Sequence, residues 1–290
     1  MSLLCEPDNL WHSFAAMEGN MIMKDTERIV VKIGTTTIMR ESRTVNLRTL
    51  DNLARILSDI KGMGNEVILV SSGAIAVGTN KLGFTERPAE LRMKQATAAV
   101  GQLELMHLYD KLFAEYGQIV GQILLTDEDV EIPERKENLI RTFEALLELG
   151  VIPVVNENDS VSYAEIETGH NKILGDNDTL SAIVAVLCQA DRLILLTDTD
   201  KLYECDPREN PGAKPVDVVY EITDNLRAMA GGSGSSWGTG GMATKLIAGE
   251  IALKNGIEMT ITSGQRLESL YEILEGKSVG TRFVPKKQRS

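Results

Sequence analysis

The chain has 290 residues, of which 43% are hydrophobic and 25% charged, an ordinary balance for a globular protein of one or two domains. A formal net charge of −12 argues against nucleic acid as a main partner, because phosphate backbones bind basic surfaces. No apolar run approaches the roughly 20 residues of a membrane span, so we expect no membrane partner. Three scattered cysteines and three unclustered histidines indicate a reducing cytoplasm and no metal site built from side chains.

Residues 1–22 carry neither a basic start nor an apolar stretch, so they do not resemble a signal peptide. They precede the first strand-like run, and we expect a disordered extension outside the folded domain, with Met21 and Met23 as alternative starts. The folded domain is predicted to cover residues 23–285. The tail after residue 284 is short and basic, and we expect no appended domain there.

Short apolar runs rich in β-branched residues alternate with amphipathic stretches along the rest of the chain. The runs predict strands and the amphipathic stretches predict helices, so the pattern indicates an α/β fold with a mostly parallel central sheet and helices on both faces. The predicted strands are 28–33, 66–70, 119–125, 151–155, 192–196 and 258–262. The predicted helices include 46–61, 89–116, 134–149, 178–189, 242–254 and 267–275, and the stretch 210–241 is predicted to be irregular.

Ligands of such a fold collect at the carboxyl ends of the strands, so the residues there are the candidate site. Lys32 ends the first strand, before Gly34. A lysine in a buried strand is costly unless it is paired, whereas a lysine at an edge extends to solvent, and both interpretations stay open. Ser72 and Gly73 follow the second strand, where helix N-terminal amides suit an anion, although serine N-caps are commoner.

Polar residues are densest after the fourth predicted strand, in the stretch NENDS (156–160). Its carboxylates and amides suit the ammonium and carboxylate groups of an amino acid, and an Asx turn is the structural alternative. Asp176, Asn177 and Asp178 precede the next predicted helix. Asp178 is there either as the N-cap or as an organiser of lysines and a magnesium nucleotide.

The stretch SSWGTGGMATK (235–245) is rich in glycine and ends in Lys245. Glycines followed by a lysine suggest a phosphate cradle, yet no Gly-Lys-Ser/Thr triplet occurs, so the stretch is not a P-loop. Taken alone, it leaves open which anion it holds, if any. Thr197 and Asp198 follow the fifth predicted strand, at the position expected for the base or ribose of a nucleotide.

Seven motifs follow one another along the chain: VVKIGT, SSGAIAVG, NENDS, GDNDTLSA, LLTD, DPR and GTGGMATK. Each is modest alone, but in this order, from about Arg28 to Phe283, they resemble the amino acid kinase family, most closely its glutamate 5-kinase branch. The resemblance implies a three-layer α/β/α sandwich. It also implies that the amino acid binds in the N-terminal part of the domain and ATP in the C-terminal part.

The activity implied by the resemblance is phosphorylation of the side-chain carboxylate of L-glutamate by ATP and Mg²⁺, the first step of proline biosynthesis. A carboxylate is already ionised at pH 7, so no general base is needed. The resemblance further implies proline as a feedback inhibitor, a homodimer or homotetramer, and glutamate-5-semialdehyde dehydrogenase as a pathway partner. The C-terminal PUA domain of many members is not expected here. The alternatives are a kinase of acetylglutamate or aspartate, or a non-catalytic nucleotide sensor on the same fold.

Residue by residue, the resemblance places Lys32 and Lys245 beside the transferring phosphoryl group, with Asp178 holding both lysines. Magnesium is expected to arrive with ATP rather than on protein side chains. The implied glutamate-binding residues are Ser72, Gly73, Asp159 and Asn177, with Asn156 and Asp176 of second rank and Asp159 near the ammonium group. The implied ATP-binding residues are Lys32, Thr197, Asp198, Thr239, Gly240, Gly241, Met242, Ala243, Thr244 and Lys245.

Two features depart from the family pattern. Lys201 stands where the family has glycine, which predicts strain if the turn there needs a positive φ. The link before Gly175 is several residues longer than usual and borders the expected glutamate site, so it is expected to bear on substrate affinity or feedback inhibition.

Overall fold

The computed structural model describes most of the chain after the predicted extension. The extension 1–22, Thr239, Gly240, Gly175 and most of the long link before it lie outside the described residues, so the predictions made for them stay predictions. The described residues are 26–161, 174, 176–205, 210, 212–231 and 241–286.

An eight-stranded sheet forms the middle layer, in the order β3-β4-β2-β1-β5-β9-β10-β8. The strands from β3 to β9 in this order run parallel, and β10 is antiparallel to β9. The strands of this sheet are β1 (Arg28–Ile33), β2 (Glu66–Val70), β3 (Val120–Leu125), β4 (Ile152–Glu157), β5 (Arg192–Thr197), β8 (Val218–Val219), β9 (Glu258–Ser263) and β10 (Thr281–Phe283). A separate two-stranded sheet pairs β6 (Leu202–Tyr203) with β7 (Pro215–Val216).

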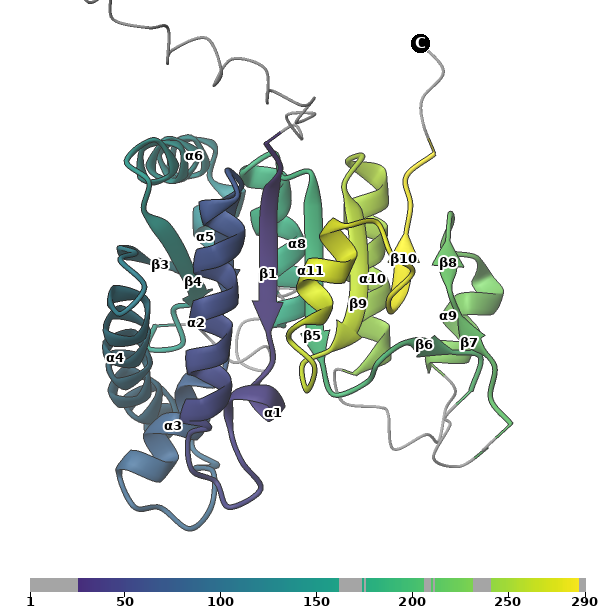
Figure 1. The fold of residues 1–290 in the computed structure, drawn as a ribbon. Coiled ribbons are helices and arrows are strands. Elements are labelled where there is room, and N and C mark those ends of the chain that lie inside the picture. Colours follow the sequence, from purple (N-terminus) through teal and green to yellow (C-terminus); the bar gives the residue numbers. More distant parts are fainter. Residues whose placement is uncertain are drawn as a thin grey trace, which may run out of the picture.

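Helices cover both faces of the sheet (Figure 1). One hydrophobic core joins the sheet to α2, α4 and α11, and a second core joins its other face to α6, α8 and α10. The chain is therefore the three-layer α/β/α sandwich that the motifs implied. The helices are α1 (Thr35–Ile38), α2 (Leu47–Gly62), α3 (Ala74–Lys81), α4 (Leu91–Ala114), α5 (Asp127–Glu131), α6 (Pro133–Glu148), α8 (Asn177–Leu187), α9 (Asp224–Gly231), α10 (Met242–Lys254) and α11 (Ser269–Leu274).

Strand β1 lies between β2 and β5 and is buried on both faces. Successive side chains of a strand point to opposite faces. Ile29 and Val31 accordingly join the core on the α2 side, and Val30 joins the core on the α8 side. Lys32 follows Val30 by two residues, so its side chain also extends toward α8. The two-residue period of one strand thus aims a lysine at the N-terminus of a helix.

The stretch 210–241, predicted to be irregular, contains three short elements within its described part. These are β7, β8 and α9, and the prediction was wrong for them. Two-residue strands are too short to display a period, and α9 spans only eight residues, so the local pattern gave little signal. None of the described helices is long and apolar enough to cross a membrane.

Candidate active site

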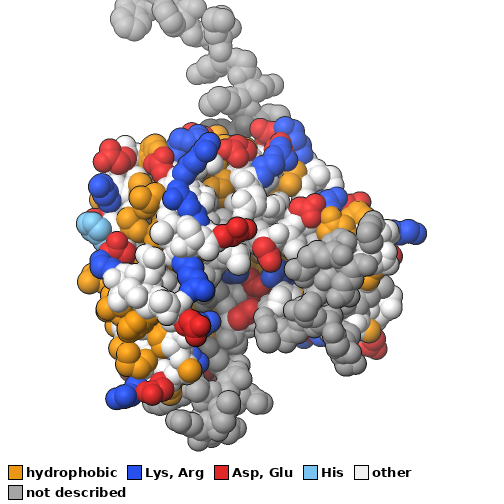
Figure 2. Space-filling view, turned by 90° about the horizontal axis from the view of Figure 1, so that it is seen from below, with side chains coloured by type: hydrophobic (Ala, Val, Ile, Leu, Met, Phe, Trp, Pro, Cys, Tyr) orange, Lys and Arg blue, Asp and Glu red, His pale blue; other side chains and the backbone are white. Residues whose placement is uncertain are grey.

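The described candidate residues gather at one end of the sheet, where β1, β2, β4 and β5 present their carboxyl ends. This end lies at the bottom of Figure 1, where α1 and α3 begin. Figure 2 views the molecule from that side and shows acidic and basic side chains close together on this face. Parallel strands bring their carboxyl ends to one edge, which is why motifs far apart in the sequence meet here.

Asp178 lies between two buried lysines at the centre of this end. Its Oδ1 is 2.6 Å from Lys32 Nζ, and its Oδ2 is 3.2 Å from Lys245 Nζ. Only 8% of Lys32, 2% of Asp178 and 7% of Lys245 is exposed. The hydroxyl of Thr244 donates to Asp178 Oδ2 at 3.2 Å, and Lys245 also donates to the carbonyl of Gly241 at 2.8 Å. The interpretation of Lys32 as an edge lysine reaching solvent was therefore wrong.

The charges of this cluster keep Asp178 ionised. Burial alone raises the pKa of its carboxyl group, but the adjacent ammonium groups of Lys32 and Lys245 outweigh burial and lower the pKa below its usual value. Two cations and one anion leave one net positive charge in a buried position. Such a charge attracts an anionic group brought to this end of the sheet.

Helix α8 is capped by Asp176, not by Asp178. The carboxylate of Asp176 accepts hydrogen bonds from the backbone amides of Asp178 and Thr179, at 3.1 and 3.0 Å. Asp176 has extended backbone angles, as an N-cap requires, whereas Asp178 is already inside the helix. The N-cap alternative for Asp178 was therefore wrong, and the side chain of Asp178 pairs with the two lysines instead.

Gly73, rather than a serine, occupies the N-cap position of α3. Its φ is 91°, and no side chain caps the helix. The hydroxyl of Ser72 instead donates to the carbonyl of Ile33 at 2.8 Å and accepts from Thr35 at 3.3 Å. A Cβ at Gly73 would lie 2.8 Å from Ile38 Cδ1. Both this close contact and the positive φ therefore favour glycine at this position. The serine-cap alternative was wrong, and the first amides of α3 have no side-chain cap.

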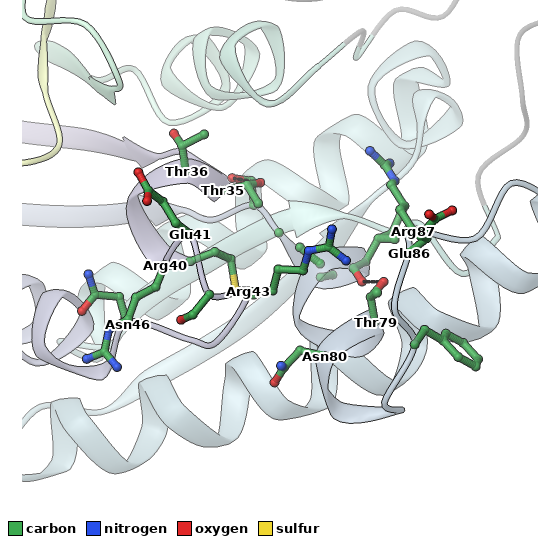
Figure 3. Close-up of a pocket in the computed structure, with 18 of the residues that line it drawn as sticks. Thr35, Thr36, Arg40, Glu41, Arg43, Asn46, Thr79, Asn80, Glu86 and Arg87 are labelled. Atoms are coloured by element: carbon green, nitrogen blue, oxygen red, sulfur yellow. Dashed lines mark hydrogen bonds between the residues drawn. The ribbon is translucent and has the colours of Figure 1, made fainter.

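A cavity of about 1560 Å³ opens beside these residues (Figure 3). It extends from the start of α3 to the turn after α1 and to the α3–α4 connection. Four predicted glutamate-binding residues line it, namely Ser72, Gly73, Asp159 and Asn177.

The two glutamate-binding candidates of second rank are not among the residues that line this cavity. Asp176 is engaged as the cap of α8. Asn156 is 1% exposed, and its amide donates to Gln102 Oε1 of α4 at 2.9 Å. These contacts give both residues a place in the fold next to the cavity rather than in it.

Apart from Lys32 of β1, the described candidate nucleotide residues lie at β5 and at the start of α10. The Thr197 hydroxyl donates to the carbonyl of Thr199 at 2.9 Å, and Asp198 beside it is exposed. Helix α10 begins after Gly241 without a side-chain cap, which leaves its first amides available to an anion. Met242 is buried, Ala243 is exposed and Thr244 is half-buried.

Lys201 does not sit in a strained turn. Among the described residues, the non-glycine residues with positive φ are Arg43 and Gln189. The ammonium group of Lys201 pairs with Asp217, and the side chain of Lys201 is one-quarter exposed, at 25%. The strain expected from lysine at this position is therefore absent.

The family model of the amino acid kinase family matches residues 27–263. The chain belongs to the amino acid kinase family, as its ordered motifs indicated.

Within that family, the chain is similar to glutamate 5-kinases of several bacteria. The chain is 51% identical to the glutamate 5-kinase of Clostridium perfringens over 265 residues, which cover 91% of this chain and 98% of the relative. It is 48% identical to the glutamate 5-kinase of Listeria innocua, over 92% of this chain and 96% of the relative.

Solved structures of more distant proteins share the fold. The carbamate kinase of Giardia lamblia bound to AMP-PNP superposes with a TM-score of 0.64 at 14% identity, over 90% of this chain and 99% of that chain. The UMP kinase of Bacillus anthracis gives a TM-score of 0.59 at 14% identity, over 89% of this chain and 96% of that chain. At such identities the likeness concerns the fold alone.

The site contains residues to which the sequence analysis gave no role. Thr35 contacts Ser72, Gln102 contacts Asn156, and Arg43 lines the cavity. Gln102 lies in a long helix and carries no local signal. Arg43 lies in the polar stretch MRESRT after the first strand. This stretch belongs to none of the seven motifs.

Proposed function

We propose that this protein transfers the γ-phosphoryl group of ATP to the side-chain carboxylate of L-glutamate, giving L-glutamyl 5-phosphate and ADP. The buried cluster of Lys32, Asp178 and Lys245 is the observation that carries this proposal. Two relatives about half identical to the chain are named glutamate 5-kinase, and this supports glutamate as the acceptor. The product fits the first step of proline biosynthesis in the cytoplasm.

In the proposed reaction a γ-carboxylate oxygen of glutamate attacks the γ-phosphorus of ATP in line. A new bond forms between this carboxylate oxygen and the γ-phosphorus. The bond from the γ-phosphorus to the β,γ-bridging oxygen breaks, and ADP leaves with that oxygen. The attacking carboxylate is already ionised, so no side chain has to remove a proton. The work left to the protein is positioning and charge neutralisation.

Lys32 and Lys245 are proposed to neutralise the negative charge on the transferring group, one from the sheet and one from α10. Asp178 fixes both ammonium groups, because each of its oxygens is within 3.2 Å of one of them. Hydrogen-bond donors that are held in place before the reaction need not reorganise when charge develops in the transition state. Such preorganised electrostatic stabilisation is the largest single contribution to the rate enhancement of many enzymes.

The substrates are proposed to meet at this cluster from opposite sides. Glutamate would occupy the cavity lined by Ser72, Gly73, Asp159 and Asn177, with its ammonium group near Asp159. ATP would lie across the C-terminal half of the domain, against Thr197, Asp198 and residues 239–245. The uncapped starts of α3 and α10 each offer amides to an anion, one on each side.

Magnesium is proposed to bind through the nucleotide. Within the described ranges, no group of three or more Asp, Glu, His and Cys side chains is placed to hold a metal. Both oxygens of Asp178 are occupied by lysines, so this carboxylate does not fit as a metal ligand. A magnesium ion on the phosphates would supply further positive charge while keeping several waters. A homodimer or homotetramer and inhibition by proline are also proposed for this protein.

The test is formation of an acyl phosphate, trapped with hydroxylamine as a hydroxamate. We expect a hydroxamate only when L-glutamate, ATP and Mg²⁺ are all present. N-acetylglutamate and aspartate serve as matched acceptors, and equal or faster turnover with either would refute glutamate as the substrate. ATP binding without turnover of any acceptor would indicate a nucleotide sensor on this fold.

A further inference from the structure

The cavity is larger than one molecule of glutamate requires. Its volume is about 1560 Å³, whereas pockets for whole drug-sized ligands hold roughly 300–1,000 Å³. The proposed substrate residues occupy one end of it. The other end is lined by the turn after α1 and by the connection between α3 and α4 (Figure 3). The proposed function assigns nothing to this outer end.

The proposed function also leaves one charge of glutamate without a cationic partner. In the proposed arrangement, the lysines lie beside the γ-carboxylate and its phosphoryl group, and Asp159 lies beside the ammonium group. The α-carboxylate remains, and a carboxylate withdrawn from water requires charged or hydrogen-bonding partners. Among the described residues that line the cavity, the basic ones are Arg40, Arg43 and Arg87.

Arg43 is held on a turn that is tied to the inner end of the cavity. Its amide donates to the carbonyl of Arg40 at 2.8 Å, and the turn is closed by a bridge between Met39 and Val45. The turn follows α1 directly. Helix α1 in turn contacts the substrate residues, because Thr35 donates to Ser72 and Ile38 lies against Gly73.

The conformation of Arg43 is one that a side chain disfavours. Its φ is 64°, in the left-handed region where glycine is the usual residue. Residues held in such regions cluster at ligand sites, where the surrounding structure maintains them.

The guanidinium group of Arg43 is free to take an anion. It forms no ion pair with any described residue, including Glu41 and Glu86, the carboxylates of the outer end. In Figure 3 Arg43 extends across the cavity toward Thr79 of α3, whereas Arg40 turns aside toward Asn46.

We propose that Arg43 binds the α-carboxylate of L-glutamate and so determines the specificity of the site for an α-amino acid. This inference rests on the proposed function. A guanidinium group presents two parallel N–H donors that match the two oxygens of a carboxylate, which gives both affinity and orientation. An acceptor that lacks the α-carboxylate gains nothing from this contact.

The experiment compares L-glutamate with 4-aminobutyrate, which has the same chain and terminal carboxylate but no α-carboxylate. Arg43→Gln should lower kcat/KM for L-glutamate by about 10- to 100-fold, mainly through KM, as expected for a lost charge-assisted hydrogen bond. The constants for 4-aminobutyrate and ATP should stay within about twofold. Because 4-aminobutyrate is measured both as a substrate and as a competitor of glutamate, a constant is obtained even if it is not phosphorylated.

Two further variants distinguish a loss of glutamate binding from a loss of folding and from the loss of one positive charge on this turn. Arg43→Gly suits the left-handed backbone, so it should unfold at the same or a higher temperature and yet lose glutamate affinity as Arg43→Gln does. Arg40→Gln removes the same charge from the same turn and should leave the KM for glutamate within about twofold of the wild-type value.

Three results would overturn the assignment of Arg43. These are an equal loss with 4-aminobutyrate, an equal loss in Arg40→Gln, or no loss in either Arg43 variant. Failure of the proposed function looks different, because the wild-type protein would then not phosphorylate glutamate at all. In that case, calorimetric titration of both compounds into the unreacted protein still tests Arg43.

Discussion

At the scale of single residues, Asp178 supports both the proposed reaction and the fold. Asp178 is 2% exposed, and its carboxylate is paired with two lysines that are themselves buried. Breaking a buried ion pair by removing one partner leaves an uncompensated charge and costs about 3–5 kcal/mol. Asparagine keeps the size of the side chain but not its charge.

We therefore predict that Asp178→Asn lowers both turnover and the free energy of unfolding, the latter by about 3–5 kcal/mol. Turnover is to be measured at a temperature where the variant is fully folded, beside urea unfolding of the same preparation. Asp59→Asn is the matched control, because Asp59 is exposed and accepts a hydrogen bond from Tyr271 that asparagine can also accept. It should change stability by less than about 0.5 kcal/mol.

The stability difference has a pH dependence of known sign. The pKa of Asp178 is lowered in the folded protein, so its contribution to stability is present above its ordinary value of 3.8 and is lost as the pH falls through the lower folded value. The difference between wild type and Asp178→Asn should thus be constant near neutral pH and shrink below about pH 3.8. A difference unchanged down to the acid transition would show that the charge of Asp178 is not what stabilises the fold.

At the scale of elements, the pair α3 and α4 is packed through two glycines. A Cβ on Gly101 of α4 would lie 1.8 Å from the carbonyl oxygen of Ala74, and one on Gly78 of α3 would lie 2.0 Å from that of Thr97. Backbone atoms cannot yield as flexible side-chain ends do. The absence of side chains at these two positions thus lets α3, which lines the cavity, approach α4 closely.

We predict that Gly101→Ala destabilises the protein by about 1–3 kcal/mol, the usual cost of overpacking, although alanine is the better helix former. Gly62→Ala at the end of α2 is the control, because a Cβ there meets nothing within 4 Å. This control should be neutral or stabilising by up to about 1 kcal/mol. Urea unfolding measures both variants, and equal stability of the two would refute the close approach of α3 and α4.

At the scale of the whole molecule, stability is expected to fall from the centre of the sheet outward. Strands β1 and β5 pair with each other and carry cores on both faces, whereas β6 and β7 form a separate pair of two residues each. Local opening is easiest where few apolar contacts and few backbone hydrogen bonds must break.

Native-state hydrogen exchange should therefore show a graded pattern. The amides of β1 and β5 should exchange only through global unfolding, so that their opening free energy equals that from urea unfolding. Those of β6 and β7 should exchange through local opening at lower free energy. Mass spectrometry of peptides from both regions makes the comparison, and similar protection of both would contradict a stability gradient.

The order of elements could be predicted from the sequence because long buried strands and amphipathic helices carry their periods locally. All six predicted strands are present in the parallel part of the sheet, with boundaries shifted by at most a few residues. The two-residue strands, which are too short to have a period, and the two-turn helix α9 were missed. The family could also be predicted, because seven ordered motifs cover nearly the whole fold.

Tertiary structure alone decided which of two roles each candidate residue takes. From the sequence, Lys32 could reach solvent and Asp178 could cap a helix; in the fold, Asp176 takes the cap and Asp178 pairs with both lysines. The tertiary structure also places Arg43 in the lining of the same cavity as Ser72, although Arg43 belongs to none of the motifs. The physical reason is that local sequence determines period and capping tendency, whereas pairing of buried charges depends on which elements the sheet brings together.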